Sequence, residues 1–95
     1  MAYSRLNHLR KVYYVQEYTK IMQTEGMPSK RIFSVVCMLY PISAGTYYNY
    51  LRTPAKVLIR KEGTNMSELE REKDRIVRIL MRLSDYERKL HQKAE

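Results

Sequence analysis

Some residue types are scarce in this chain of 95 residues, and each scarcity narrows what the protein can be. It has one cysteine, so no disulfide can form within the chain, and a reducing compartment such as the cytoplasm is expected. Glycine and proline occur three times each and fall between apolar segments, as in a helical protein with short connections. No apolar run approaches the ~20 residues of a membrane span, and residues 1–11 lack the apolar stretch of a signal peptide. We therefore expect a cytoplasmic protein with no membrane partner.

The residue types that usually carry catalysis or bind cofactors are also few. His8 and His91 are the only histidines, and neither has a cysteine or carboxylate nearby at a metal-ligand spacing. The chain has no glycine-rich phosphate loop, and Cys37 lies in an apolar run, where a buried thiol is a poor nucleophile. We therefore expect no enzymatic activity, no cofactor, no metal ion and no small-molecule substrate.

Acidic residues are absent from the whole middle of the chain. No Asp or Glu occurs between Glu25 and Glu62, although the same stretch contains six basic residues. Residues 1–62 hold ten Lys and Arg against three Asp and Glu, whereas residues 63–95 hold eight against seven. This asymmetry indicates a polyanionic partner for the first two-thirds of the chain, with a generically basic, soluble protein as the alternative. The six residues are Lys30, Arg31, Arg52, Lys56, Arg60 and Lys61.

Apolar periodicity predicts an all-α fold. Apolar residues recur at spacings of three and four over residues 4–25, which is typical of one face of an amphipathic helix, and Gly26 is placed to end it. Further helices are expected over residues 28–39 and 44–52, the second of them capped by Ser43. Residues 54–62 fit a short helix or a short strand, and the lack of a partner strand favours the helix. A Ser-x-x-Glu capping box at Ser67 predicts a long helix that runs to about residue 93.

The long C-terminal helix has a heptad pattern that suggests self-association. One heptad position is apolar throughout, and the intermediate position is apolar in the second half of the helix. We expect the middle of this helix to pack on the body and its ends to form a seam with a second copy. The alternative is a helix that lies entirely across its own domain. Its charged residues alternate in sign, which predicts a solvated, salt-bridged outer face. The expected dimerisation residues are Leu69, Ile76, Ile79, Leu83, Tyr86 and Leu90.

Residues 36–51, with the sequence VCMLYPISAGTYYNYL, resemble the core of helix-turn-helix DNA-binding domains of the small phage, plasmid or mobile-element kind. Shared features are the apolar–small pair Val36-Cys37, Ser43 after the turn, a Thr-Tyr-Tyr stretch over residues 46–48, and the closing Leu51. In this family the second helix of the pair lies in the major groove of DNA. Pro41 stands where the family often has glycine, so the turn must differ, because proline cannot adopt a positive φ.

The resemblance implies a recognition helix over residues 43–52. Its outward positions would lie near base edges, where Asn49 can pair with adenine and Arg52 with guanine or a phosphate. Among the nine tyrosines, we expect Tyr48 and Tyr50 at the surface and residues 13, 18, 40 and 47 mostly in the core. The full expected nucleic-acid-binding set is Lys30, Arg31, Ser43, Ala44, Gly45, Thr46, Tyr48, Asn49, Arg52, Lys56, Arg60 and Lys61.

The sequence thus predicts a tri-helical helix-turn-helix core in residues 1–62, followed in residues 63–95 by a long amphipathic helix for packing and dimerisation. The expected function is binding of double-stranded DNA by a homodimer that acts as a transcriptional regulator or as a mobile-element accessory factor. The alternative is a protein-interaction module, for example a phage-encoded inhibitor or adaptor, whose long C-terminal helix binds a partner protein.

Overall fold

The computed structural model describes the backbone of residues 5–93 and the side chains of residues 5–90. In chain order the helices are α1 (Arg5–Thr24), α2 (Ser29–Leu39), α3 (Ala44–Arg52), α4 (Ala55–Lys61) and α5 (Met66–Lys93). The described part of the chain has no strand, so the predicted all-α class is confirmed, and residues 55–61 are helical as favoured.

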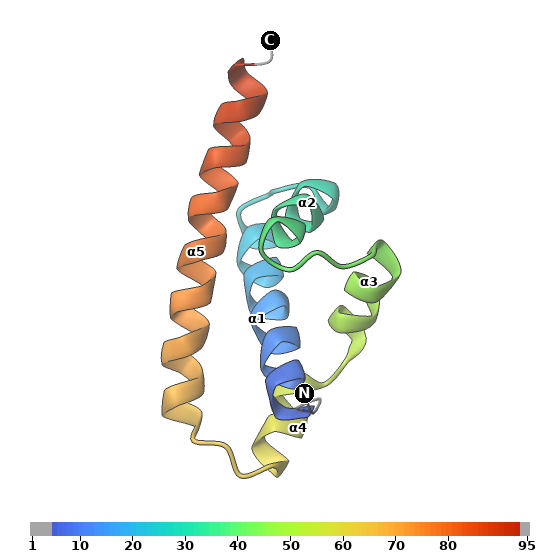
Figure 1. Ribbon diagram of the computed structural model, residues 1–95, viewed down its shortest axis with the longest axis vertical. Helices are drawn as coiled ribbons and strands as arrows, with labels where there is room; N and C mark the ends of the chain where they lie inside the picture. Colours follow the sequence, from blue (N-terminus) through green and yellow to red (C-terminus); the bar gives the residue numbers. More distant parts are fainter. Residues whose placement is uncertain (1–4, 94–95) are drawn as a thin grey trace.

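Helix α1 is the centre of the fold. It contacts each of the other helices, and Figure 1 shows it between α5 on one side and α3 on the other, with α2 and α4 near its two ends. Its buried residues, Leu9, Val12, Tyr13, Tyr14, Val15, Tyr18, Thr19 and Met22, are distributed around the helix axis. The prediction of a single apolar face was therefore wrong, because four helices cover this one and bury most of its circumference.

Two glycines and an asparagine define one end each of three helices. Gly26 follows α1 with φ +86° and Gly63 follows α4 with φ +76°, a conformation that side chains disfavour. The expected cap of α5 at Ser67 was wrong. The side chain of Asn65 accepts hydrogen bonds from the backbone N–H groups of Ser67 (2.9 Å) and Glu68 (3.3 Å), so the cap lies two residues earlier and the helix begins at Met66. Asparagine serves as well as serine at this position.

Helix α5 shares one core with the rest of the chain. Leu69, Ile76, Val77 and Leu80 are buried, and α5 contacts both α1 and α2. The hydroxyl of Tyr13 on α1 donates a hydrogen bond of 2.5 Å to the Glu70 carboxylate. The expected boundary between residues 62 and 63 falls in the loop before α5, but the apolar side chains of both parts pack together. Beyond α2, the last turns of α5 continue past the body (Figure 1).

None of the helices described is both long and apolar enough to cross a membrane.

Candidate nucleic-acid interface

The N-terminus of α3 has the cap that the sequence predicts. Ser43 adopts an extended conformation, and its Oγ accepts a hydrogen bond of 3.1 Å from the backbone N–H of Thr46. The same hydroxyl donates to Thr46 Oγ1 at 2.9 Å. Both hydroxyls are thus engaged with each other, and Thr46 is half-buried. The first backbone N–H groups of α3 have no acceptor inside the helix, which leaves this end attractive to an anion.

The outward face of α3 contains the residues expected there. Ala44, Gly45, Tyr48, Asn49 and Arg52 are all exposed, and Tyr48 is 52% exposed. A Cβ atom added at Gly45 would meet only the Ser43 hydroxyl, 4.0 Å away, so nothing in the fold requires glycine at this position. The small residues at the start of α3 leave its backbone open to close approach by another molecule.

Helix α3 is held against α1 and α2 by buried contacts. Tyr47 is 1% exposed, and its ring lies 5.2 Å from that of Phe33 on α2. Its hydroxyl is 2.9 Å from the Thr19 hydroxyl on α1. The Gln16 side chain on α1 donates hydrogen bonds to the backbone carbonyls of Tyr50 and Thr53 at the end of α3. These contacts fix which face of α3 points outward.

The expectation that Tyr50 lies at the surface was wrong. Its side chain is 6% exposed and its ring packs edge-on against His8 at 5.5 Å. Lys11 lies 5.7 Å from the Tyr50 ring centroid and 5.8 Å from that of Tyr40, in positions suited to cation–π attraction. Tyr40, expected mostly in the core, is only half-buried. Tyr50 is drawn inward because α1 packs against this side of α3.

Helix α4 continues the basic surface directly after α3. Only Thr53 and Pro54 separate Arg52 from this helix, whose buried residues Ala55 and Ile59 give it an inner face. The opposite face exposes Lys56, Arg60 and Lys61, and none of these side chains forms an ion pair with the described residues. The carboxylates nearest to them are Glu62, which follows Lys61 in the chain, and Glu70 of α5. The pKa of Glu70 is lowered by the hydrogen bond from Tyr13 and, in part, by the charge of Lys56.

The two basic residues at the start of α2 differ in availability. Lys30 is exposed and has no ion-pair partner in the described structure. Arg31, in contrast, lies 3.3 Å from Glu87 of α5, a carboxylate whose side chain is 10% exposed. Arg31 therefore ties α2 to α5, and it does not belong with the free cations of the expected nucleic-acid-binding set. The two partners lie 56 residues apart, so local sequence could not reveal this pair.

The expected dimerisation residues divide into two groups. Leu69 is 1% exposed and Ile76 is 8% exposed, because both pack into the core of their own chain, so assigning them to a seam between copies was wrong. The others continue this apolar side toward the C-terminal end of α5, at spacings of four, three and four. Ile79 and Leu83 are half-buried, whereas Tyr86 is 55% and Leu90 is 48% exposed. An apolar stripe thus remains uncovered on the last turns of α5.

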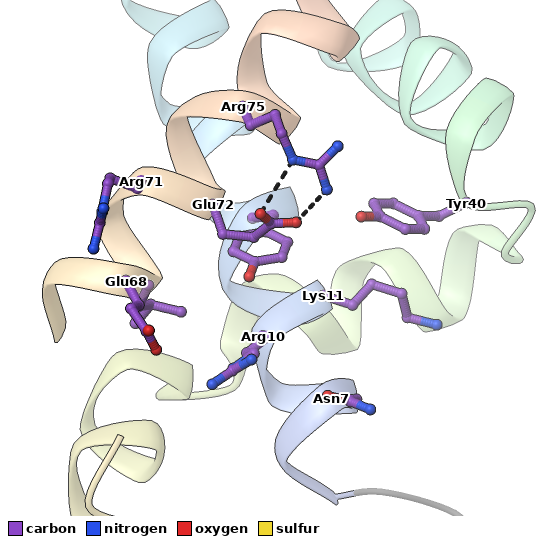
Figure 2. Close-up of a pocket in the computed structure, with 10 residues that line it drawn as sticks. Asn7, Arg10, Lys11, Tyr40, Glu68, Arg71, Glu72 and Arg75 are labelled. Atoms are coloured by element: carbon purple, nitrogen blue, oxygen red, sulfur yellow. Dashed lines mark hydrogen bonds and ion pairs between the residues drawn. The ribbon is translucent and has the colours of Figure 1, made fainter. Parts of the chain in front are cut away.

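A cleft of about 760 Å³ separates the first turns of α1 from the start of α5. Figure 2 shows Arg75 directed at Glu72, with the Tyr40 hydroxyl pointing toward this ion pair. Arg10 and Arg71 line the same cleft from the two helices, and the Nε atom of Arg10 is buried without a hydrogen-bond partner. Basic side chains outnumber carboxylates in this lining: Asn7, Arg10, Lys11, Tyr14, Tyr40, Glu68, Leu69, Arg71, Glu72 and Arg75.

Tyr14, Tyr40 and Glu72 in the cleft have pKa values shifted away from neutral pH. Burial raises the pKa of Tyr40, and the nearby Glu72 carboxylate raises it further. Burial and Glu72 act in the same way on the pKa of Tyr14. The hydrogen bonds from Arg75 lower the pKa of Glu72. The phenols therefore stay protonated and able to donate hydrogen bonds. Across the described residues, no group of three His, Cys, Asp or Glu side chains is placed to hold a metal ion.

No protein-family model, no curated protein and no solved structure matches this chain.

Proposed function

We propose that this protein binds double-stranded DNA through α3 and α4. The observation that supports this best is a set of exposed cations without ion-pair partners on α3 and α4, close in the chain to a helix face of small and polar residues. Arg52, Lys56, Arg60 and Lys61 form this set, with no carboxylate in the chain from Gly26 to Lys61. Phosphate contacts by such cations supply most of the affinity of a protein for DNA.

The proposed roles follow from position on the two helices. The outward residues of α3 face the major groove, with Asn49 contacting bases and Arg52 a base or a phosphate. The α4 cations, and Lys30 at the start of α2, contact the backbone, which sets the register of α3 without reading sequence. Such a protein would serve as a transcriptional regulator or a mobile-element accessory factor. The single cysteine suits a reducing compartment, so we place this activity in the cytoplasm.

We expect the Asn49→Ala/Arg52→Ala variant to lose DNA affinity about 10- to 100-fold while remaining folded, since one base or phosphate contact is worth about 1–3 kcal/mol. Both residues are exposed, so neither contributes to the core. Fluorescence anisotropy with a labelled duplex over a series of about 50 to 300 mM salt measures the loss. Wild-type log affinity should fall linearly with log salt, by about 0.9 per phosphate contact.

The matched control is Gln23→Ala/Arg88→Ala, which also removes one polar side chain and one positive charge from exposed positions, on α1 and α5. This control should bind DNA as the wild type does. If the folded Asn49→Ala/Arg52→Ala variant instead keeps full affinity, α3 does not read DNA. If the wild type binds no duplex even at the lowest salt, the protein-interaction module becomes the better account.

The proposal includes a homodimer formed by the exposed stripe of α5. Ile79, Leu83, Tyr86 and Leu90 occupy alternating heptad positions, and the last turns extend past α2, where no other helix covers them (Figure 1). The stripe covers only about 16 Å at 1.5 Å per residue, so we expect a weak dimer that DNA binding reinforces. Its two recognition helices would contact half-sites about 34–36 Å apart.

We expect Tyr86→Glu/Leu90→Glu to convert the dimer to a monomer, because charges in a seam of this kind remain unpaired and buried. Both side chains are about half exposed in the single chain, so its fold should be unaffected. Sedimentation velocity over a range of protein concentrations measures the effect, with Arg88→Glu on a neighbouring face as the control. A wild-type protein that stays monomeric at all concentrations contradicts the dimer.

A further inference from the structure

Helix α5 presents a row of basic residues on the side that faces away from the body. Their spacings of four, three, four and seven residues place them on one side of the helix, opposite the buried Leu80. All are exposed, and along this line only Asp85 interrupts them. The row covers about 27 Å at 1.5 Å per residue. It consists of Arg71, Arg75, Arg78, Arg82 and Lys89, and we call it the basic row.

The acidic residues of α5 do not neutralise the basic row. Four of the five α5 carboxylates that form ion pairs do so with a cation outside the row: Glu70 and Asp74 with Lys73, Asp85 with Arg88, and Glu87 with Arg31. Only Arg75 of the row is paired, with Glu72. Among the residues whose side chains are described, Arg71, Arg78, Arg82 and Lys89 have no carboxylate partner. The row therefore presents net positive charge to solvent.

One end of the basic row opens into the cleft between α1 and α5. Arg71 and Arg75 belong to the row and also line the cleft, where Arg10 adds a third guanidinium group (Figure 2). The Nε atom of Arg10 is buried without a hydrogen-bond partner. The guanidinium groups that line the cleft would meet a phosphate at its mouth through charge-assisted hydrogen bonds.

The basic row and the α3 surface face in different directions. In Figure 1, α5 and α3 lie on opposite sides of α1, and each turns its buried residues toward the body. Their exposed faces therefore point away from each other. The molecule measures 27 and 26 Å across its two shorter axes, so a straight duplex lying on α3 does not reach the row.

The chemistry of the basic row favours nucleic acid over a protein partner. Four of its five members are arginine, whose planar guanidinium binds a phosphate through two parallel hydrogen bonds. No apolar side chain lies in the row, whereas protein interfaces need buried aromatic or aliphatic anchors. Binding to a phosphate backbone needs no such anchor, because releasing counterions from the nucleic acid supplies the affinity.

We propose that the basic row is a second nucleic-acid surface, which binds the phosphate backbone of a duplex without reading its sequence. Together with α3 and α4, it lets one protein molecule hold two duplex segments at once. The claim that one protein molecule holds two duplexes rests on the function proposed above. The claim that the basic row binds the phosphate backbone of a nucleic acid does not.

The test is a bridging experiment in which the full-length protein links a biotinylated duplex on beads to a fluorescent duplex in solution. We expect the wild type to retain the fluorescent duplex. Arg78→Gln/Arg82→Gln should still bind a single duplex but reduce retention of the second to the level without protein. Glutamine preserves helix propensity at these exposed positions, and circular dichroism verifies the fold. The control Lys20→Gln/Arg88→Gln removes two charges that are each ion-paired, from outside both surfaces, and should bridge normally.

The variants separate this inference from the proposed function. If Arg78→Gln/Arg82→Gln bridges as well as the wild type, the basic row is not a nucleic-acid surface. An acidic protein then becomes the better candidate partner for the row. The assay is run at protein concentrations at which sedimentation velocity shows a monomer, so that two α3 surfaces of a dimer do not bridge the duplexes. If Asn49→Ala/Arg52→Ala binds like the wild type while the row variant binds no duplex, the row is upheld and the α3 interface fails. A wild type that binds the bead-bound duplex but retains no fluorescent duplex overturns the row alone, and a wild type that binds neither duplex overturns both.

Discussion

Raising the pH above 10 is expected to unfold the protein in one cooperative transition. Tyr13, Tyr18 and Tyr47 are at most 1% exposed. Burial raises the pKa of each above the ordinary value of 10.0, because a phenolate loses its hydration in the core. The folded state therefore holds these protons more tightly than the unfolded state does. The contribution of this tighter proton binding to the free energy of unfolding is fully present below pH 10. It is lost as the pH rises toward the folded pKa values.

The size of this effect is large for a domain of 95 residues. A buried tyrosine costs about 1.4 kcal/mol of stability for each pH unit above the unfolded pKa, for as long as the pH stays below the folded pKa. Tyr13, whose pKa is raised furthest, contributes over the widest pH range, and the raised pKa values of Tyr18 and Tyr47 add to the loss. The free energy of unfolding of most domains is about 5–15 kcal/mol. We therefore expect the midpoint of unfolding to lie above pH 10.

The measurement compares phenolate absorbance with helical circular dichroism across an alkaline titration. The late part of the phenolate signal should coincide with loss of helix. Tyr18→Phe removes one buried ionisable group while keeping the ring, so its midpoint should move to higher pH. Tyr48→Phe is the control, because the Tyr48 ring is 52% exposed. Complete tyrosine ionisation in a protein that remains helical would show that these hydroxyls are not buried.

Local sequence predicts α3 and its cap because the determinants lie within a few residues. Ser43 provides the capping hydroxyl, and Pro54 follows the helix closely enough to end it, so the bounds 44–52 need no distant contact. The start of α5 is harder, because Asn65 and Ser67 are both good caps two residues apart. Nothing in the local sequence decides between them.

Which face of a helix is buried depends on the helices that pack against it, and the local sequence does not identify these helices. The heptad pattern of α5 marks Leu69 and Leu90 as equivalent, yet one is buried against its own chain and the other is about half exposed. An apolar stripe has the same period whether it packs on its own body or on another copy. The Tyr13–Glu70 and Arg31–Glu87 contacts join residues more than 50 positions apart, so they too follow only from the fold.

The basic row can be recognised in the sequence when residues 71–89 are placed on a helix of 3.6 residues per turn. Basic residues at 71, 75, 78, 82 and 89 share one helix face, but neighbours such as Glu70, Glu72 and Asp74 make the segment look alternately charged. That alternation predicted a salt-bridged outer face, and ion pairs do form beside the row. The side of α5 that faces away from the body became identifiable only when the core showed which side packs inward.

The largest single-residue effect on stability is expected for Leu80→Ala. Leu80 is completely buried on α5, the helix that contacts both α1 and α2. Removing three carbon atoms there leaves a cavity, and such substitutions cost about 2–5 kcal/mol. Urea denaturation measures the change in the free energy of unfolding. The matched control is Leu90→Ala on the same helix, 48% exposed, which should cost less than about 0.5 kcal/mol at concentrations where the protein is monomeric.

The same experiment tests whether residues 1–62 and 63–95 form one folding unit. Because Leu69, Ile76, Val77 and Leu80 complete the core around α1, the urea transition of Leu80→Ala should remain single and shift as a whole. A second transition, or equal losses for Leu80→Ala and Leu90→Ala, would mean that α5 is not docked on α1 and α2. An undocked α5 would also leave the direction of the basic row undefined relative to α3. The packing of α5 on α1 and α2 therefore determines how the two proposed nucleic-acid surfaces are oriented relative to each other.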